Sequence, residues 1–322
     1  MRRGARQGVG TAVTLALASV LAGCATEPSA APSIAIVAFA EHETASTCTD
    51  ALLAALADHG YRAGPSLLVA RYSAGGDASH SHAAWAAAVH SKPDLLIALG
   101  SPMIRVACAG TEARPTVAAY CFDLAAAGVV DGNGARLPFV TGVTSPPPVN
   151  AVVALLAAIR PQPLRIGVVY NPREAIAMNQ VLTARVAFAN AGMALVEAEI
   201  AAAVDIPSAM VQLRERGIAA LWKLGDTTVA PAAATLLSLA RDADLPVIGD
   251  HARQLDEGAI AFAAIDWSAT GREAGKLAAA ILAGARPADL PLVRETGAQV
   301  GWNRERAEAL QLRVLRPDDH PR

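Results

Sequence analysis

The chain has 322 residues, of which 53% are hydrophobic and 17% are charged, and its formal net charge is −2. This balance is typical of a globular chain with a large buried core and excludes a disordered protein. The mild acidity, without any basic cluster, argues against nucleic acid as a partner. The length suits one large domain or two medium ones.

The N-terminal segment combines a basic head, an apolar run and a cysteine. Three arginines within the first six residues precede an apolar run over 9–21, which leads into Leu-Ala-Gly-Cys24. The run is shorter than the roughly 20 residues that a membrane-spanning helix needs. The segment resembles a bacterial lipoprotein signal, which implies cleavage before Cys24 and a lipid such as palmitate on its thiol. We therefore expect 1–23 to be a signal peptide and 24–33 a flexible tether. The membrane is then a partner only through this lipid anchor, in the periplasm or at the cell surface, and the sequence leaves inner and outer membrane open.

From residue 34 onward, short apolar runs alternate with segments of helical periodicity. The pattern predicts strands over 34–39, 66–72, 94–100, 115–122 and 139–143, and helices over 47–59, 80–90 and from Pro102 onward. The segment SPPPVN (145–150) interrupts this pattern, because consecutive prolines cannot continue a helix. We interpret it as a crossing between two lobes.

A second series of the same kind follows the prolines. It predicts strands over 165–170, 194–199, 219–224, 246–249 and 259–265, helices over 174–191, 205–216, 230–243 and 269–283, and an extended segment over 292–302. Two such series indicate an α/β fold with two doubly wound parallel-sheet lobes and a hinge. We expect lobe 1 to comprise 34–145 plus roughly 250–290, and lobe 2 to comprise 146–249 plus roughly 291–322.

Ligands of such sheets bind beyond the carboxyl ends of the strands, so the strand-end loops hold the candidate contacts. The candidate ligand-binding residues are Glu41, His42, Ser101, Asp123, Asn171, Glu174, Asp226, Thr227, Asp250 and Trp267. Asp226 precedes a predicted helix, so its carboxylate either pairs with a ligand ammonium or caps that helix. The same two alternatives hold for Asp123 and Asp250, with capping favoured for Asp250.

Other chemistries find little support in these loops. Glu41, His42 and Glu43 form a polar loop, but ligands so close in sequence seldom converge on a metal by themselves, so we expect neither a metal nor a cofactor. Trp267 either stacks on a ligand or packs in the core, and an aromatic content of 4% speaks against a rich aromatic cage. No serine elbow, zinc-protease motif or phosphate loop is present, so we do not expect an enzyme.

Three cysteines remain once Cys24 is assigned to lipid: Cys48, Cys108 and Cys121. An oxidising compartment permits one disulfide, for which Cys108 with Cys121 is the preferred pair. Three separate buried thiols are the alternative.

A series of segments in matching order resembles ABC-transporter substrate-binding lipoproteins of the type I periplasmic binding fold, in the subfamily that includes aromatic-amino-acid binders. The segments are LADHGY (56–61), KPDLLIA (92–98), TGV (141–143), VVYNPRE (168–174), GDTTV (225–229), PVIGD (246–250) and AGARPADLP (283–291). The resemblance implies a solute-binding protein of an importer, with a small-molecule ligand and an ABC permease as partners. A sensor of the same fold that signals to a membrane kinase or cyclase is the alternative.

The sequence departs from the family pattern at the expected ligand site. Ile176 and Ala177 stand where the family usually has Asn-Ser, Thr227 follows Asp226 in place of Asn, and Asp123 lies in Phe-Asp-Leu instead of Thr-Asp-Pro. Side-chain donors for a ligand carboxylate are therefore missing at the start of the helix over 174–191. The ligand is expected to be amino-acid-like or more apolar.

Overall fold

The computed structural model describes residues 31–110, 113–162 and 164–314. The signal peptide, the lipidation site Cys24 and most of the tether lie outside these residues. Within the described ranges no helix combines the length and the apolar character that crossing a bilayer would require.

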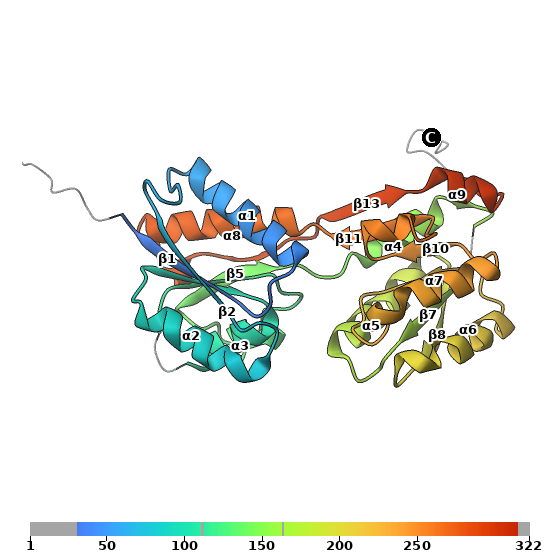
Figure 1. Ribbon diagram of the computed structural model, residues 1–322, viewed down its shortest axis with the longest axis horizontal. Helices are drawn as coiled ribbons and strands as arrows, with labels where there is room; N and C mark the ends of the chain where they lie inside the picture. Colours follow the sequence, from blue (N-terminus) through green and yellow to red (C-terminus); the bar gives the residue numbers. More distant parts are fainter. Residues whose placement is uncertain (1–30, 111–112, 163, 315–322) are drawn as a thin grey trace, which may run out of the picture. The chain divides into compact units, whose positions relative to one another are not determined.

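The first lobe is built on a sheet of six parallel strands in the order β12-β5-β4-β3-β1-β2 (Figure 1). These strands are β1 (Ser33–Ala38), β2 (Leu68–Ser73), β3 (Leu95–Leu99), β4 (Thr116–Ala119), β5 (Val140–Thr144) and β12 (Leu292–Arg294). Helices α1 (Glu43–Asp58) and α8 (Trp267–Leu282) cover one face, and α2 (Ser81–His90) and α3 (Ser101–Ala109) cover the other.

The packing of β1 on both faces explains why its sequence is apolar from Ile34 onward. Ile34 and Ile36 belong to the core beneath α1 and α8, whereas Ala35 and Val37 belong to the core beneath α2 and α3. Successive side chains of a strand point to opposite faces, so a strand covered on both sides must be apolar at every position.

Helices α1 and α8 pack closely because α8 presents glycines to α1. A Cβ added to Gly271 would overlap the carbonyl of Cys48, and one added to Gly275 would lie 2.6 Å from the carbonyl oxygen of Leu52. The absence of side chains there lets the two backbones approach, which fixes α8 and its first residue, Trp267, against the first lobe.

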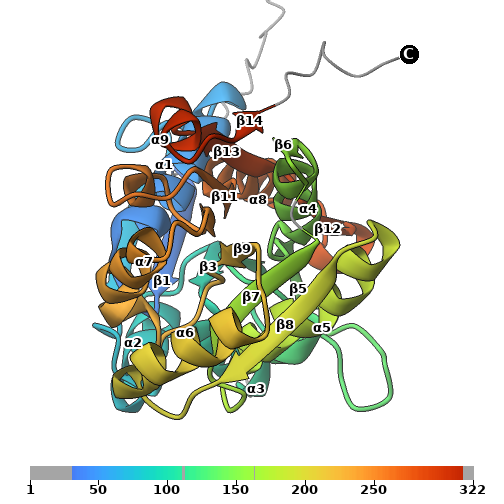
Figure 2. The same ribbon diagram turned by 90° about the vertical axis from the view of Figure 1, so that its right-hand side faces the viewer.

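The second lobe repeats the arrangement with the order β13-β11-β10-β9-β7-β8 (Figure 2). Its strands are β7 (Arg165–Tyr170), β8 (Ala194–Glu199), β9 (Ala220–Trp222), β10 (Val247–Gly249), β11 (Ala261–Ile265) and β13 (Ala298–Trp302), of which only β13 is antiparallel to its neighbour. Helices α4 (Val149–Ala157) and α5 (Ala175–Asn190) lie on one face, and α6 (Ile206–Glu215) and α7 (Ala233–Asp242) on the other. The short α9 (Arg304–Ala309) and the pair β6 (Ile159–Arg160) and β14 (Arg313–Val314) complete it.

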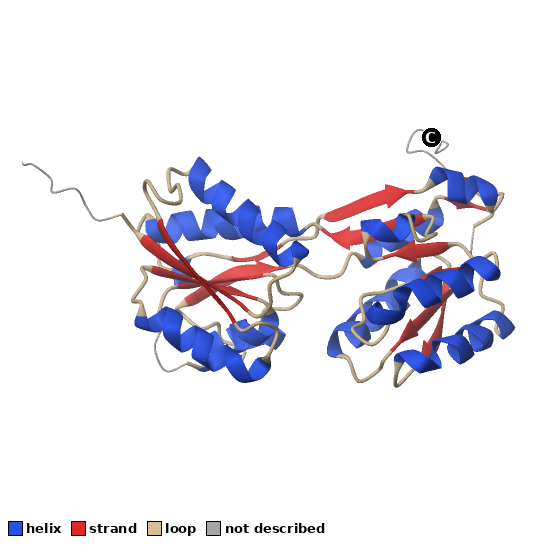
Figure 3. Ribbon diagram, viewed as in Figure 1, coloured by secondary structure: helices blue, strands red, loops and turns tan. Residues whose placement is uncertain are grey.

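The chain crosses between the two sheets three times (Figure 3). The crossings lie at 145–148, at Asp266 and at 295–297. The second and third differ from the boundaries expected near 250 and 290, since β11 pairs with β10 in the second sheet and β12 pairs with β5 in the first. Strand pairing decides sheet membership, and local composition does not record it.

Local details also differ from the predictions. Helix α4 follows the prolines directly, where only a break was predicted, and the extended segment over 292–302 forms two strands in different sheets. Helix α1 starts at Glu43 because the His42 ring accepts a hydrogen bond from the N–H of Ala45 at 3.4 Å. All three cysteines in the described part are free thiols, so the disulfide alternative is not realised.

Candidate ligand-binding site

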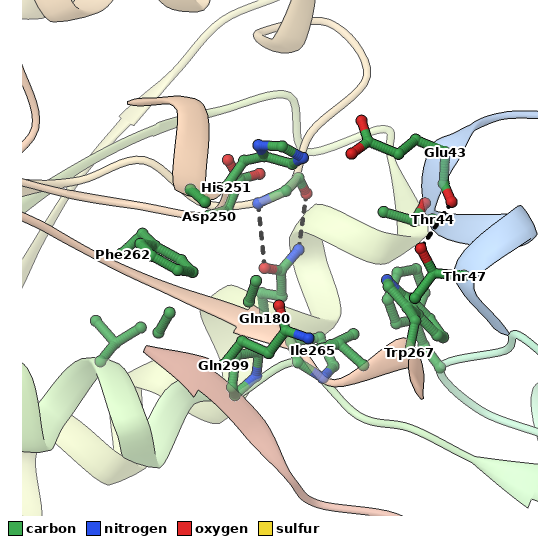
Figure 4. A pocket seen from close by; sticks show the side chains of 18 of the residues that line it. Glu43, Thr44, Thr47, Gln180, Asp250, His251, Phe262, Ile265, Trp267 and Gln299 are labelled. Carbon is green, nitrogen blue, oxygen red and sulfur yellow. Dashed lines mark hydrogen bonds between the residues drawn. The ribbon is translucent and has the colours of Figure 1, made fainter. Parts of the chain in front are cut away.

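Two neighbouring cavities open at the strand-end loops and share one wall. The large cavity, of 670 Å³, is lined by the loops after β1, β3 and β4 and by the start of α5. The small cavity, of 330 Å³, is lined by the start of α1 and the ends of β9, β10 and β11 (Figure 4). Tyr120, Phe122 and Trp267 line both cavities, and we call these three residues the aromatic wall.

The aromatic wall is a contiguous cluster. The ring centroids of Tyr120 and Trp267 are 4.2 Å apart, and those of Phe122 and Trp267 are 5.9 Å apart. The chain has five Phe, four Tyr and four Trp residues, and six of them line one or both cavities: Phe39, Tyr120, Phe122, Trp222, Phe262 and Trp267. The two cavities therefore hold more aromatic side chains than the aromatic content of 4% suggested, because the few aromatic residues are concentrated where the loops meet.

Tyr120 is held in an unusual backbone conformation at the end of β4. Its φ is +57°, a left-handed value that is an outlier for an aromatic residue. Its hydroxyl lies 2.7 Å from the Thr44 hydroxyl and 3.4 Å from the His42 ring nitrogens. Burial raises the pKa of the Tyr120 phenol, and the hydrogen bond with Thr44 partly opposes that rise. Strained backbone positions of this kind cluster at ligand sites, and the ring of Tyr120 packs against Trp267.

Glu174 joins the start of α5 to the loop after β9. Its carboxylate accepts hydrogen bonds from the N–H groups of Thr227 at 2.9 Å and Thr228 at 2.8 Å, and from the Thr228 hydroxyl at 2.5 Å. Burial by itself would raise the pKa of Glu174, but the hydrogen bonds from Thr228 and Thr227 outweigh it and lower the pKa. Both oxygens are thus occupied within the second lobe, although Glu174 and Thr227 line the large cavity.

Asp226 caps the turn after β9. One carboxylate oxygen accepts from the N–H of Asn171 at 2.7 Å, and the other accepts from the N–H groups of Thr228 at 2.7 Å and Val229 at 3.0 Å. Its residue is 4% exposed. Asn171 donates its side-chain amide to the Thr228 hydroxyl at 2.9 Å. Neither Asp226 nor Asn171 lines either cavity, so the geometry corresponds to the capping alternative for Asp226.

Asp250 lines the small cavity and is paired with Lys223, which was not among the predicted ligand-binding residues. Lys223 donates to both carboxylate oxygens at 2.7 Å and is itself 4% exposed. Gln254 donates to the same carboxylate at 3.0 Å. Beside them, the Gln180 amide bonds to the backbone N–H and carbonyl of Gly225 (Figure 4). A lysine inside an otherwise apolar strand segment, in a chain with very few lysines, was the available signal for this pair.

The remaining candidates divide between cavity and surface. His42, Ser101 and Asp123 line the large cavity. Ser101 lies 3.2 Å from the Cys121 sulfur through its hydroxyl, and one oxygen of Asp123 accepts from the N–H groups of two following residues at 2.9 and 3.1 Å. Glu41 is exposed and lines neither cavity. In the part of the chain that the structure describes, no group of three or more His, Cys, Asp and Glu residues is placed to hold a metal.

Two α/β lobes, built on one parallel and one mainly parallel sheet and connected by three chain segments, define a binding protein of the type I periplasmic fold. The chain belongs to the family of ABC transporter substrate-binding proteins, whose family model matches residues 33–318. The resemblance expected from the sequence is thereby confirmed.

Individual relatives are similar over nearly the whole chain. A tyrosine-binding protein of Clostridioides difficile (strain R20291) is 23% identical over 287 residues, which cover 89% of this chain and 83% of the relative. A conserved domain protein of Vibrio cholerae is 28% identical, with a TM-score of 0.71 over 88% of this chain and 96% of the other. An ABC domain in complex with L-Trp from Streptococcus pneumonia is 22% identical, with a TM-score of 0.72 over 89% and 97% of the two chains. A ligand-free, open substrate-binding protein from Clostridium difficile is 23% identical, with a TM-score of 0.77 over 89% and 97%.

Proposed function

We propose that this protein is the substrate-binding component of an ABC importer and captures a small molecule between its lobes by hinge closure. Family membership supports the link to an ABC transporter. The cavities support capture between the lobes, since each is lined by residues of both. Three single-chain crossings are compatible with hinge motion, in which a few residues absorb the change in backbone angles. The family match favours transport over the sensory alternative.

The ligand we propose is an aromatic amino acid or a similar small aromatic solute. The observation that carries this proposal is the aromatic wall, which faces both cavities. Aromatic rings attract one another in offset or tilted arrangements beyond their burial in general, so the wall provides a surface for a ligand ring. The other oxygen of Asp123, Oδ2, accepts no hydrogen bond within the described residues and is available to a ligand ammonium in the large cavity. Two relatives, one named for tyrosine and one bound to L-Trp, are consistent with such a ligand.

A lipid on Cys24 is proposed to keep the protein at the outer side of a bacterial membrane. The supporting feature is the lipobox-like Leu-Ala-Gly-Cys24 after a short apolar run. Cys24→Ala should move the protein from the membrane fraction to the soluble fraction and abolish labelling by a palmitate analogue. Equal labelling of Cys24→Ala and wild-type protein would contradict lipidation at this residue.

Binding is tested by isothermal titration calorimetry with L-tryptophan, L-tyrosine, L-phenylalanine and, as non-aromatic controls, L-leucine and glucose. Trp267→Ala should weaken the binding of the aromatic ligands about tenfold, because an aromatic contact contributes about 0.5–1.5 kcal/mol beyond burial. Trp85→Phe is the matched control, since Trp85 packs in the first-lobe core beneath α2 and α3 and lines neither cavity. Absence of binding by all three aromatic amino acids would refute the proposed ligand class.

A further inference from the structure

The second-lobe wall of the large cavity offers no free charge. It consists of Glu174, Ala175, Ile176, Asn179 and Thr227. The Glu174 carboxylate is the only ionisable group among these five residues, and both of its oxygens already accept hydrogen bonds from Thr227 and Thr228. Ala175 and Ile176, at the start of α5, contribute only apolar side chains. No charged side chain of this wall is therefore free to pair with a charged group on the ligand.

The first-lobe wall of the large cavity includes a cationic residue, Arg105. This residue of α3 is exposed and lines the large cavity, and in the described ranges its guanidinium has neither an ion pair nor a hydrogen bond. Arg105 lies one helical turn after Ser101, which lines the same cavity, so both side chains lie on one face of α3. Its field reaches the thiol beside Ser101: burial raises the pKa of Cys121, and the Arg105 charge is among the influences that oppose this rise.

We propose that Arg105 recognises a carboxylate on the ligand and thereby determines specificity for aromatic solutes that carry one. The inference rests on the proposed function, which supplies the aromatic part of the ligand. A guanidinium presents a planar fork of N–H donors that matches a carboxylate in two hydrogen bonds. Arg105 and Asp123 line the same cavity from the first lobe, so this lobe offers one cationic and one anionic partner. These two charges complement the zwitterion of an α-amino acid, while the aromatic wall takes the ring.

Three indole compounds separate the contributions of the ligand carboxylate and the ligand ammonium to binding. Their affinities are measured by isothermal titration calorimetry with the purified protein. L-tryptophan carries both charged groups, tryptamine lacks the carboxylate, and 3-indolepropionate lacks the ammonium. Arg105→Gln should weaken L-tryptophan and 3-indolepropionate about 10- to 100-fold, the range for a hydrogen bond to a charged group. Tryptamine should change by less than about threefold, since it has no carboxylate to lose. Arg105→Lys should recover part of the loss, because it keeps the charge without the fork.

The control for net charge is Arg241→Gln on α7, an exposed arginine that lines neither cavity and should leave all three affinities unchanged. Arg105 forms no hydrogen bond or ion pair within the described residues, so its removal should leave the thermal unfolding midpoint unchanged. A loss of binding is then not a loss of folding. If wild-type protein binds L-tryptophan, but Arg105→Gln lowers the affinity for L-tryptophan no more than the affinity for tryptamine, the Arg105 assignment is wrong and the proposed function stands. If none of the three indoles binds wild-type protein, the proposed aromatic ligand and the Arg105 assignment both fail.

Discussion

Replacing Asp226 with alanine should destabilise the second lobe while leaving ligand affinity nearly unchanged. The carboxylate accepts three backbone hydrogen bonds, from the N–H groups of Asn171, Thr228 and Val229, at 2.7, 2.7 and 3.0 Å. At 4% exposure, water cannot readily replace it. The substitution therefore leaves three N–H groups without an acceptor in a largely buried turn.

The expected loss is about 3 kcal/mol of unfolding free energy. Loss of a helix cap costs about 0.5–2 kcal/mol, and an orphaned buried donor costs about 1–3 kcal/mol, with contributions that do not add fully. For a chain of this size each kcal/mol lowers the unfolding midpoint by about 2–4 °C, so Asp226→Ala should unfold about 6–12 °C below wild type. Differential scanning calorimetry measures the shift.

Asp256→Ala is the matched control, because Asp256 is exposed and its carboxylate accepts no hydrogen bond within the described residues. It should melt with wild type. Asp226→Asn should fall between, since its amide keeps one oxygen acceptor. An Asp226→Ala protein that melts with wild type but has lost ligand binding would refute the capping role and restore a ligand-pairing role for Asp226.

Three further predictions concern other buried or hydrogen-bonded groups. Lys223→Met should lower the free energy of unfolding, measured in urea, by about 2–3 kcal/mol. The loss is small for a broken buried pair because the Asp250 side chain is 26% exposed. Adding Asp250→Leu should recover part of it. The lowered pKa of Glu174 means that its stabilisation is present above its ordinary pKa of 4.5 and disappears as the pH falls through the folded-state value. The urea midpoints of wild type and Glu174→Gln should therefore differ at pH 7 and converge as the pH falls below that value, and a constant difference would contradict this. Burial raises the pKa of Cys48 to about 12 and that of Cys108 to about 11, so iodoacetamide at pH 8 should modify neither thiol in the folded protein and both after unfolding, as read by mass spectrometry.

Much of the architecture followed from local periodicity. Strands β7 and β8 occupy the predicted residues 165–170 and 194–199. Strand β7 is apolar and buried after its first residue, whereas β8, at the edge of the sheet, is fully buried only at alternate positions, Val196 and Ala198. The prediction failed where strand pairing decided the outcome: β11 joined the second sheet through β10, the preceding strand, and 292–302 divided between two sheets. Hydrogen bonds between strands leave no local trace in composition.

The candidate site shows the same division between local and distant information. Strand-end position alone placed His42, Ser101 and Asp123 in loops that line the large cavity. It could not distinguish them from Asp226, which occupies an equivalent strand end but whose carboxylate accepts hydrogen bonds from three backbone N–H groups. Residues at equivalent strand ends therefore have different roles, some lining the cavity and others capping a turn.

The sequence by itself determined the family, the two α/β lobes and the strand-end loops in which ligand contacts are expected, because apolar periodicity and segment order can be read along the chain. The tertiary structure alone decided which charges remain free. It paired Lys223 with Asp250 and gave the carboxylates of Glu174 and Asp226 hydrogen-bond donors within the second lobe. Among the described residues it gave the Arg105 guanidinium, on the cavity wall, neither an ion pair nor a hydrogen bond. It also brought Trp267 onto Tyr120. Whether a polar group stabilises the fold or is available to a ligand depends on the neighbours that folding brings close to it.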